Sequence, residues 1–297
     1  MAKTRSGSKT PEDHLEKLLD DYLERLEDVV VGDAVVFVGP LIYGADEVIR
    51  DTLEAIRDKK AKLVVLLETD GGYIEVVERI VSTLRHYYQS VEFVVPSYAM
   101  SAGTVLAMSG DAIYMDYFSL LGPIDPQVQR PDGQMIPALG YLIQYERLIK
   151  KSREGKLTTA ELTYLVQKFD PAELYRFEQA RELSITLLKE WLVNYKFRNW
   201  TKTRSRKRPV TPSMRTRRAG QIAKELNRTE KWHSHSRGIS MEVLARDLRL
   251  EVHDFGKNHE LNEKIRAYYG LLKDYMARVQ HGGVVHARGS YRPLGGI

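Results

Sequence analysis

The chain contains no cysteine among its 297 residues. It therefore cannot form a disulfide framework, a thiolate metal site or a cysteine nucleophile. It also lacks a run of the roughly 20 apolar residues that a membrane-spanning helix needs, and residues 1–10 lack the apolar core of a signal peptide. The spacing of a zinc hydrolase motif is missing as well. We therefore expect a cytoplasmic protein without a membrane span, whose reaction needs no metal or other cofactor.

Acidic residues are missing from one stretch, 196–218, which holds ten lysines and arginines. Because the formal charge of the whole chain is only +5, this basic stretch is a local feature. Such a run can follow nucleic-acid phosphates, and Trp200 within it could stack on a base. Pro209 and Pro212 favour instead a mobile, solvated loop without acidic partners inside the protein. We prefer this loop, or a protein-contact surface, over nucleic-acid binding.

Two apolar runs end in residues suited to acyl transfer. The run 63–67 is followed by Gly71 and Gly72, and the run 91–95 is followed by Ser101 and small residues. Glycines let bare backbone N–H groups approach an oxyanion, and small residues let a helix begin directly behind a serine nucleophile. Either segment alone is also typical of a strand-to-helix turn with a serine N-cap. Their pairing favours the catalytic interpretation.

Hydrophobic periodicity predicts alternating strands and helices in the first half. The expected strands are 33–41, 63–68, 91–96 and 112–116, and the expected helices are 11–30, 45–59, 74–88 and 101–108. This alternation implies right-handed parallel crossovers. Because ligands bind at the carboxyl ends of parallel strands, we expect Gly71, Gly72 and Ser101 at one edge of the sheet.

The second half is predicted to be mainly helical. We divide the chain into a disordered tail (1–10), an N-terminal helix (11–32), a core with a helical extension (33–195), a basic insertion (196–218), a helical part completing the site (219–280) and a loose tail (281–297). Within the helical parts, helices are expected at 138–151, 158–168, 171–195, 220–227, 240–248 and 260–277.

Three ordered motifs carry a family resemblance: LLETDGGYI at 66–74, FVVPSYAMSAGTV at 93–105 and LGPIDPQ at 121–127. Together they resemble the serine dehydrogenase proteinase family, relatives of the proteolytic subunit of Clp protease and of signal peptide peptidase A. The similarity covers roughly 33–145, with a weaker echo at 232–239. It implies an α/β fold, with a Clp/crotonase-like repeated β-β-α core and mainly helical C-terminal additions. It also implies a serine endopeptidase that acts on a peptide or protein substrate as a homo-oligomer.

A serine hydroxyl needs an oriented base to become a nucleophile. The segment 232–239 resembles the late tryptophan, histidine and isoleucine segment of the family, which makes His235 the favoured base for Ser101. A shift of two residues would select His233 instead. Asp125 is the expected orienting acid, although it could merely cap the turn between two prolines. The backbone N–H groups of Gly72 and Ala102 would hold the oxyanion, with Gly71 shaping the turn.

A lysine is the alternative base, as in signal peptide peptidase A, where burial lowers its pKa. The corresponding position falls near Gly140 and Tyr141, where this chain has no lysine. Lys150 and Lys151 are the nearest in sequence.

A different class of function also fits the residues. The chain could be a catalytically inactive, Clp-like oligomeric interaction protein that keeps Ser101 as a relic. Its basic stretch would then bind an acidic partner or nucleic acid.

Overall fold

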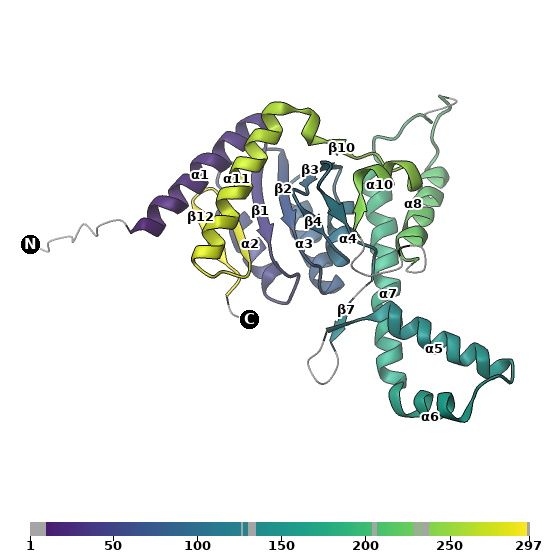
Figure 1. Ribbon diagram of the computed structural model, residues 1–297. Coiled ribbons are helices and arrows are strands. Elements are labelled where there is room, and N and C mark those ends of the chain that lie inside the picture. The colour runs from purple at the N-terminus through teal and green to yellow at the C-terminus, as the bar shows by residue number, and fades with distance from the viewer. Residues whose placement is uncertain are drawn as a thin grey trace, which may run out of the picture.

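The computed structural model describes residues 10–125, 127–129, 135–203, 207–228, 232 and 238–295 (Figure 1). In this part of the chain, a central sheet lies between two layers of helices. From one edge to the other, its strands are β10 (His253–Asp254), β5 (Ala112–Met115), β3 (Ser90–Val94), β2 (Lys62–Glu68), β1 (Asp33–Val38), β11 (Val284–Ala287) and β12 (Ser290–Pro293). The predicted α/β class is confirmed.

The strands from β10 to β1 are parallel, and only the pairings of β11 are antiparallel among the described pairs of this sheet. In the register of β1 and β2, Val35 lies beside Val65 and Phe37 lies beside Leu67. Because the strands are parallel, the loops after β1, β2 and β3 leave the same edge of the sheet. These loops carry the residues that the sequence singles out.

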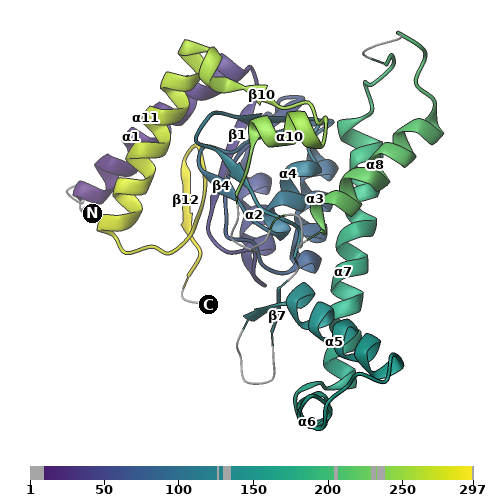
Figure 2. The same cartoon turned by 45° about the vertical axis from the view of Figure 1, so that its right-hand side comes forward.

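Both faces of the sheet are buried, as the continuous apolar runs predict. Val35 and Phe37 belong to the core under α2 (Ala45–Ala55), α3 (Ile74–Tyr87) and α4 (Ala102–Met108). The alternate residues Val36 and Val38 belong to the second core. Two long helices, α1 (Pro11–Val30) and α11 (His259–Arg278), cover that second core and lie side by side in Figures 1 and 2.

The start of α1 follows directly from its sequence. The hydroxyl of Thr10 accepts a hydrogen bond from the N–H of Asp13, and the carboxylate of Asp13 accepts one from the N–H of Thr10. This reciprocal capping box, followed by proline in the first turn, satisfies N–H groups that a helix end leaves free. The helix predicted from Pro11 is confirmed.

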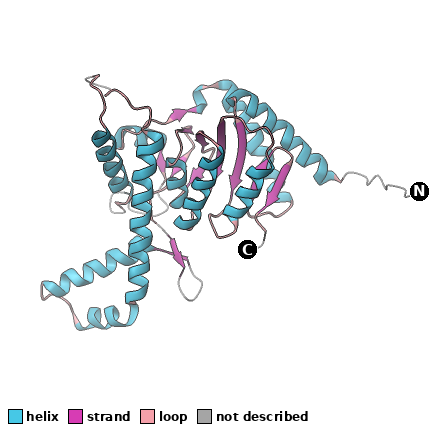
Figure 3. Ribbon diagram, turned by 180° about the vertical axis from the view of Figure 1, so that it is seen from behind, coloured by secondary structure: helices cyan, strands magenta, loops and turns pink. Residues whose placement is uncertain are grey.

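The middle of the chain forms a helical arm, defined here as residues 138–180 (Figure 3). It comprises α5 (Ala138–Arg153), α6 (Thr159–Lys168) and the first half of α7 (Pro171–Trp191). The arm has its own small core of Leu142, Leu174, Phe177 and Ala180. The rest of α7 packs on the main core and continues into a π-helical turn, η1 (Leu192–Lys196).

The remaining elements close the fold around the sheet. They are the helices α8 (Pro212–Leu226) and α10 (Met241–Asp247), the 3₁₀ turn η2 (Phe255–Lys257), a small sheet of β4 (Tyr98–Ala99), β6 (Leu120–Leu121) and β9 (Ile239–Ser240), and a pair formed by β7 (Gln127–Gln129) and β8 (Met135–Pro137). The helix expected near 240–248 is confirmed as α10, and the hydroxyl of Ser240 caps it by accepting a hydrogen bond from the N–H of Val243.

The prediction of a loose tail at 281–297 is wrong. Strand β11 pairs with β1 in the central sheet, and β12 pairs with β11. Val284, Val285 and His286 are fully buried, and the ring of His286 hydrogen-bonds to Tyr268 of α11. The apolar pair and the histidine therefore dock this segment on the sheet, despite the glycines around it.

The prediction of a mobile loop across the basic stretch is also wrong in part. Helix α8 begins at Pro212, with the hydroxyl of Thr211 as its cap, so it includes the last three arginines of the stretch. Arg198 forms an ion pair with Asp111 at 2.7 Å, and Trp200 packs on Phe197 with ring centroids 5.7 Å apart. The stretch therefore has an acidic partner inside the fold. Residues 204–206 lie outside the described residues.

No helix in the described part of the chain is long and apolar enough to cross a membrane.

Candidate active site

Ser101 occupies a sharp turn between β4 and α4. Its backbone has φ 51° and ψ −117°, a conformation that residues with a side chain rarely adopt. The side chain is 1% exposed. A serine held at a strained strand-to-helix turn is the arrangement of a nucleophile elbow, in which surrounding contacts maintain an unfavourable backbone conformation.

The glycine loop after β2 contacts this turn directly. A Cβ added at Gly71 would lie 2.8 Å from the carbonyl oxygen of Met100 and 3.0 Å from Cβ of Ser101. Gly71 also has φ +101°, which side chains disfavour. Gly71 is therefore the glycine that lets the loop approach the serine, which agrees with the role expected for it in shaping the turn.

Gly72 is required for a different contact. A Cβ there would lie 2.2 Å from the carbonyl oxygen of Leu41, in the loop after β1. Leu41 accepts from the N–H of Tyr73 at 2.8 Å and donates to the carbonyl of Gly71 at 2.9 Å, forming a parallel bridge opposite Gly72. Both bonds of this bridge are made by the neighbours of Gly72, so the N–H of Gly72 points away from Leu41.

Two backbone N–H groups near Ser101 remain available. Among the described residues, neither the N–H of Gly72 nor that of Ala102 donates a hydrogen bond to an acceptor. For Ala102 this follows from its place in the first turn of α4, where N–H groups have no intrahelical partner. Such donors can bind an oxyanion.

The loop after β6 closes the site from the other side. A Cβ at Gly122 would lie 3.0 Å from the backbone nitrogen of Ser101. The hydroxyl of Thr104, on α4, donates to the carbonyls of Ala99 and Gly122 at 2.8 and 2.9 Å. Glycine is favoured at position 122 because a side chain there would press on the backbone of Met100 and Ser101, which would have to shift.

Asp125 reaches Ser101 through its backbone. The hydroxyl of Ser101 donates to the carbonyl oxygen of Asp125 at 2.5 Å. The carboxylate of Asp125 is buried and accepts a hydrogen bond from the N–H of Leu139 at 2.9 Å, in the first turn of α5. The residue expected to act as an orienting acid therefore lies beside the serine, while its carboxylate holds the start of the helical arm.

His235 and His233 lie outside the described residues. The residues that flank them are described on both sides. Trp232 is buried and donates from its indole to the carbonyl of Glu225 in α8 at 3.0 Å. Ile239 pairs with Leu121 of β6, four residues before Asp125. The ends of the histidine segment are therefore anchored on elements that border Ser101.

The two candidate lysines lie at the far end of α5. Leu139 begins this helix beside Asp125, and at about 1.5 Å per residue Lys150 and Lys151 are roughly 17 Å further along its axis. Lys150 is exposed, and Lys151 forms an ion pair with Glu161 of α6 at 2.5 Å. Within one chain, neither lysine adjoins Ser101.

Sequence reasoning missed the residues that join the glycine loop to the serine turn. The N–H of Met100 donates to the carbonyl of Thr69 at 2.9 Å, and the hydroxyl of Thr69 accepts from the N–H of Gly71 at 3.0 Å. Burial and a hydrogen bond to Asp70 raise the pKa of Tyr98 in β4 to about 12. Thr69 and Asp70 belong to the predicted TDGG motif, but their partners are visible only in the fold.

Comparison with known proteins identifies the family. A family model described as ClpP-like SDH-type serine proteinase matches residues 25–199, which is more than half of the chain. The chain belongs to this family. The resemblance stated from the motifs is therefore confirmed, and the matched region contains Ser101, the glycine loop and Asp125.

Two curated relatives match part of this chain, and both are uncharacterized proteins of Methanocaldococcus jannaschii. One is 31% identical over 118 residues, which cover 39% of this chain and 41% of the relative. The other is 29% identical over 137 residues, which cover 44% of each. The chain thus spans less than half the length of these relatives.

Two solved structures are similar at lower identity, and both are mutants of the membrane-bound stomatin-specific protease 1510-N. A serine-to-alanine mutant is 15% identical, with a TM-score of 0.43. The alignment covers 77% of this chain and 82% of the mutant's chain. A lysine-to-alanine mutant bound to a substrate peptide is 17% identical, with a TM-score of 0.42. The alignment covers 74% of this chain and 73% of the mutant's chain.

Proposed function

We propose that this ClpP-like family member is a serine endopeptidase that cleaves peptide bonds through an acyl-enzyme on Ser101. The observation that carries the proposal is the strained, buried serine at the start of α4, with Gly71 and Gly122 packed against it. A fold that only needed an N-cap serine would gain nothing from this strain, because ordinary N-caps have extended backbone conformations.

In the proposed reaction, the hydroxyl of Ser101 exchanges its hydrogen bond to Asp125 for one to His235. The serine oxygen attacks the substrate carbonyl carbon as His235 takes the proton. The N–H groups of Gly72 and Ala102 then donate to the tetrahedral oxyanion, where losing one such donor costs about 2.7–4 kcal/mol. The C–N bond breaks as His235 returns the proton to the leaving nitrogen, and water hydrolyses the acyl ester by the reverse path.

The substrate is proposed to be a peptide in extended conformation. The edge of the glycine loop at 71–73 would pair with it as an added β-strand, because main-chain hydrogen bonds hold a peptide without fixing its sequence. We further propose that the protein acts in the cytoplasm and that it forms a homo-oligomer, and membership of a ClpP-like family supports the oligomer.

A fluorophosphonate probe tests the proposal, because it labels only an activated serine. The wild-type protein should be labelled and Ser101→Ala should not. His235→Ala should lose labelling and peptide hydrolysis while remaining folded, and His233→Ala should be milder. Near-wild-type activity in both histidine variants would remove histidine as the base. A folded wild-type protein that stays unlabelled would favour the inactive interaction protein.

Paired substitutions at Asp125 separate its two possible roles. Asp125→Asn keeps an oxygen that can accept from the N–H of Leu139 but removes the charge that would stabilise a protonated His235. If Asp125 orients the base, kcat of this variant should be about 10²- to 10⁴-fold lower than that of the wild type, with little change in the free energy of unfolding. Near-wild-type kcat in Asp125→Asn, with unfolding of the arm in Asp125→Ala, would restrict Asp125 to capping α5.

A further inference from the structure

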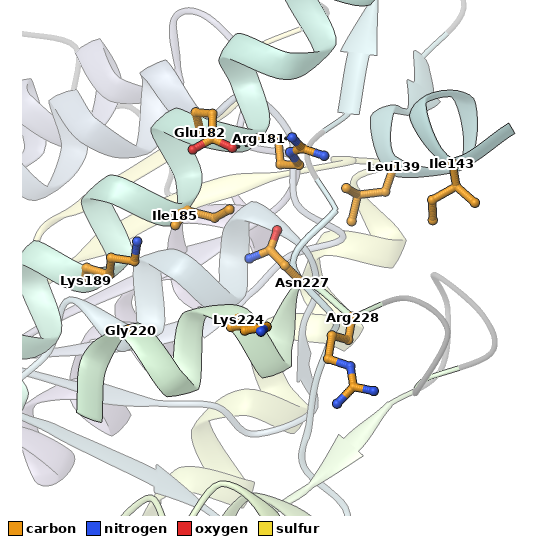
Figure 4. A pocket seen from close by; sticks show the side chains of 10 residues that line it. All are labelled: Leu139, Ile143, Arg181, Glu182, Ile185, Lys189, Gly220, Lys224, Asn227 and Arg228. Atoms are coloured by element: carbon orange, nitrogen blue, oxygen red, sulfur yellow. Dashed lines mark ion pairs between the residues drawn. The ribbon is translucent and has the colours of Figure 1, made fainter. Parts of the chain in front are cut away.

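A recess of about 550 Å³ lies between α5, α7 and α8, as Figure 4 shows. Ligand pockets usually measure about 300–1,000 Å³ and combine apolar walls with a few polar groups. Here Leu139, Ile143 and Ile185 supply apolar surface, and charged side chains from α7 and α8 supply the polar part.

The recess shares a wall with the site around Ser101. Leu139, on its α5 side, donates its N–H to the carboxylate of Asp125. On the α8 side, Leu226 accepts a hydrogen bond from the N–H of Ile124 at 3.0 Å, and the next residue, Asn227, lines the recess. The recess and the site around Ser101 therefore adjoin each other in the fold.

The charge of the recess is positive. Arg181, Lys189, Lys224 and Arg228 line it, against the single carboxylate of Glu182. Arg228 is paired with Glu225 at 3.1 Å, and Arg181 lies 3.5 Å from Glu182 and 3.7 Å from Glu146. In the described part of the chain, Lys189 and Lys224 have no carboxylate partner. Both lysines are exposed, so a ligand carboxylate can reach their ammonium groups.

Two residues that line the recess each hold a buried polar atom without a partner. Nε of Arg181 and Oδ1 of Asn227 are buried without a hydrogen bond among the described residues. Nε of Arg181 is a donor and suits a carboxylate, whereas Oδ1 of Asn227 is an acceptor and would need a donor instead.

We propose that this recess binds a carboxylate of the substrate peptide, either an acidic side chain or the C-terminal carboxylate. The inference rests on the proposed peptidase function and adds a substrate class to it. Lys189 and Lys224 act as point charges for the carboxylate, and the apolar wall takes the carbon chain that carries it. A nucleic acid would instead need a basic surface that follows many phosphates.

Binding to the Ser101→Ala protein tests the proposal without any need for turnover. The probes are rhodamine-labelled peptides of one apolar sequence, measured by fluorescence anisotropy. One has a free C-terminal carboxylate and one is amidated. In a further set of amidated peptides, each peptide carries a single glutamate, and its position moves by one residue from peptide to peptide. A matched set carries glutamine at the same positions. The free acid or a glutamate peptide should bind about tenfold more tightly than its neutral counterpart, and whichever does so identifies the source of the carboxylate. Equal binding of charged and neutral peptides overturns the proposal.

Charge reversal locates the binding in the recess. The double variant Lys189→Glu, Lys224→Glu should lose the preference for a carboxylate and gain one for a peptide with lysine at the same place. The matched control is Lys17→Glu, at an exposed position on α1. An unchanged carboxylate preference in the double variant overturns the proposal.

Fluorophosphonate labelling separates this outcome from failure of the proposed function. The lysines do not touch Ser101, so the double variant should be labelled at the wild-type rate. Labelling of the wild type without a carboxylate preference rejects only the recess. A carboxylate preference in a protein that is never labelled rejects only the peptidase.

Discussion

The sheet region around Ser101 and the helical arm are held together in different ways. In the sheet region, both faces of β1 and β2 are buried, and glycines bring backbones into direct contact. In the arm, one small core holds α5 against α7, and α6 has no buried residue. Several apolar side chains of the arm are instead exposed, namely Leu162, Tyr164, Val166 and Tyr175.

This difference suits the sheet region to holding catalytic groups in fixed positions, and it suits the arm to changing its conformation. An oxyanion site requires donors fixed within a fraction of an ångström, and backbone contacts through glycine provide such rigidity. Elements with few buried apolar contacts open at low free-energy cost, as ligand-binding parts of proteins commonly do. Asp125 joins the two regions, since its backbone carbonyl accepts a hydrogen bond from Ser101 and its carboxylate caps α5.

The largest expected effect comes from exchanging a glycine in each region for alanine. Gly72→Ala would place Cβ 2.2 Å from a backbone oxygen at φ +147°, so we expect a loss of more than about 4 kcal/mol in unfolding free energy. Gly140→Ala lies in α5 with no atom within 4 Å, so stability should stay unchanged or rise by up to about 1 kcal/mol. Denaturant unfolding measures both, and similar losses would contradict the contrast.

A smaller effect is expected from removing one phenylalanine in each region. Phe93→Ala empties a site in the main core and should lower the global unfolding free energy by about 3–5 kcal/mol. Phe177→Ala leaves a cavity in the small core of the arm, where the ring centroids of Phe177 and Tyr141 are 4.8 Å apart. It should increase hydrogen exchange in α5 and α6 while amides of β2 and β3 stay protected. Equal loss of protection in the sheet would show that the two regions unfold as one unit.

The sequence predicted the sheet region well because its signals are local. Apolar runs of strand length, each followed by glycine or small residues, specify β2, β3 and the turn at Ser101 without long-range information. The positions of Gly71 and Gly72 near the serine followed from the parallel order of the strands, whereas Asp125 was expected there from the family resemblance. The bridge from Leu41 to the glycine loop could not be predicted, because it joins residues that only the tertiary fold brings together.

The two wrong predictions have a common cause. Glycines around 282–289 and the charges of 196–218 indicated loops, yet tertiary contacts decide both segments. His286 is buried beside Tyr268 and Asp20, and Arg198 pairs with Asp111. The sequence suggests that these polar residues are solvated. In the fold they instead form hydrogen bonds and ion pairs with residues more than fifteen positions away, which composition cannot reveal.

The smallest expected effect concerns the sheet end of α7, where Lys196 lies in the π-helical turn. Burial lowers the pKa of Lys196 to about 8, although the nearby carboxylates of Glu251, Asp111 and Glu92 oppose the shift. Between about pH 8 and 10.5, the unfolded chain therefore holds a proton at this lysine that the folded protein has released. The free energy of unfolding should therefore rise with pH across this window because of Lys196. Below pH 8, the free-energy cost of burying the charged lysine is fully present.

Lys196→Met removes this pH dependence. The variant should be more stable than the wild type below pH 8, by up to about 3 kcal/mol, and the difference should shrink as the pH approaches 10. The matched control is Lys168→Met, at an exposed position in the arm, which should leave the difference from wild type constant with pH. Denaturant unfolding at several pH values measures these curves. If the Lys196→Met curve ran parallel to that of the wild type, Lys196 at the sheet end of α7 would be as open to solvent as the exposed Lys168 in the arm.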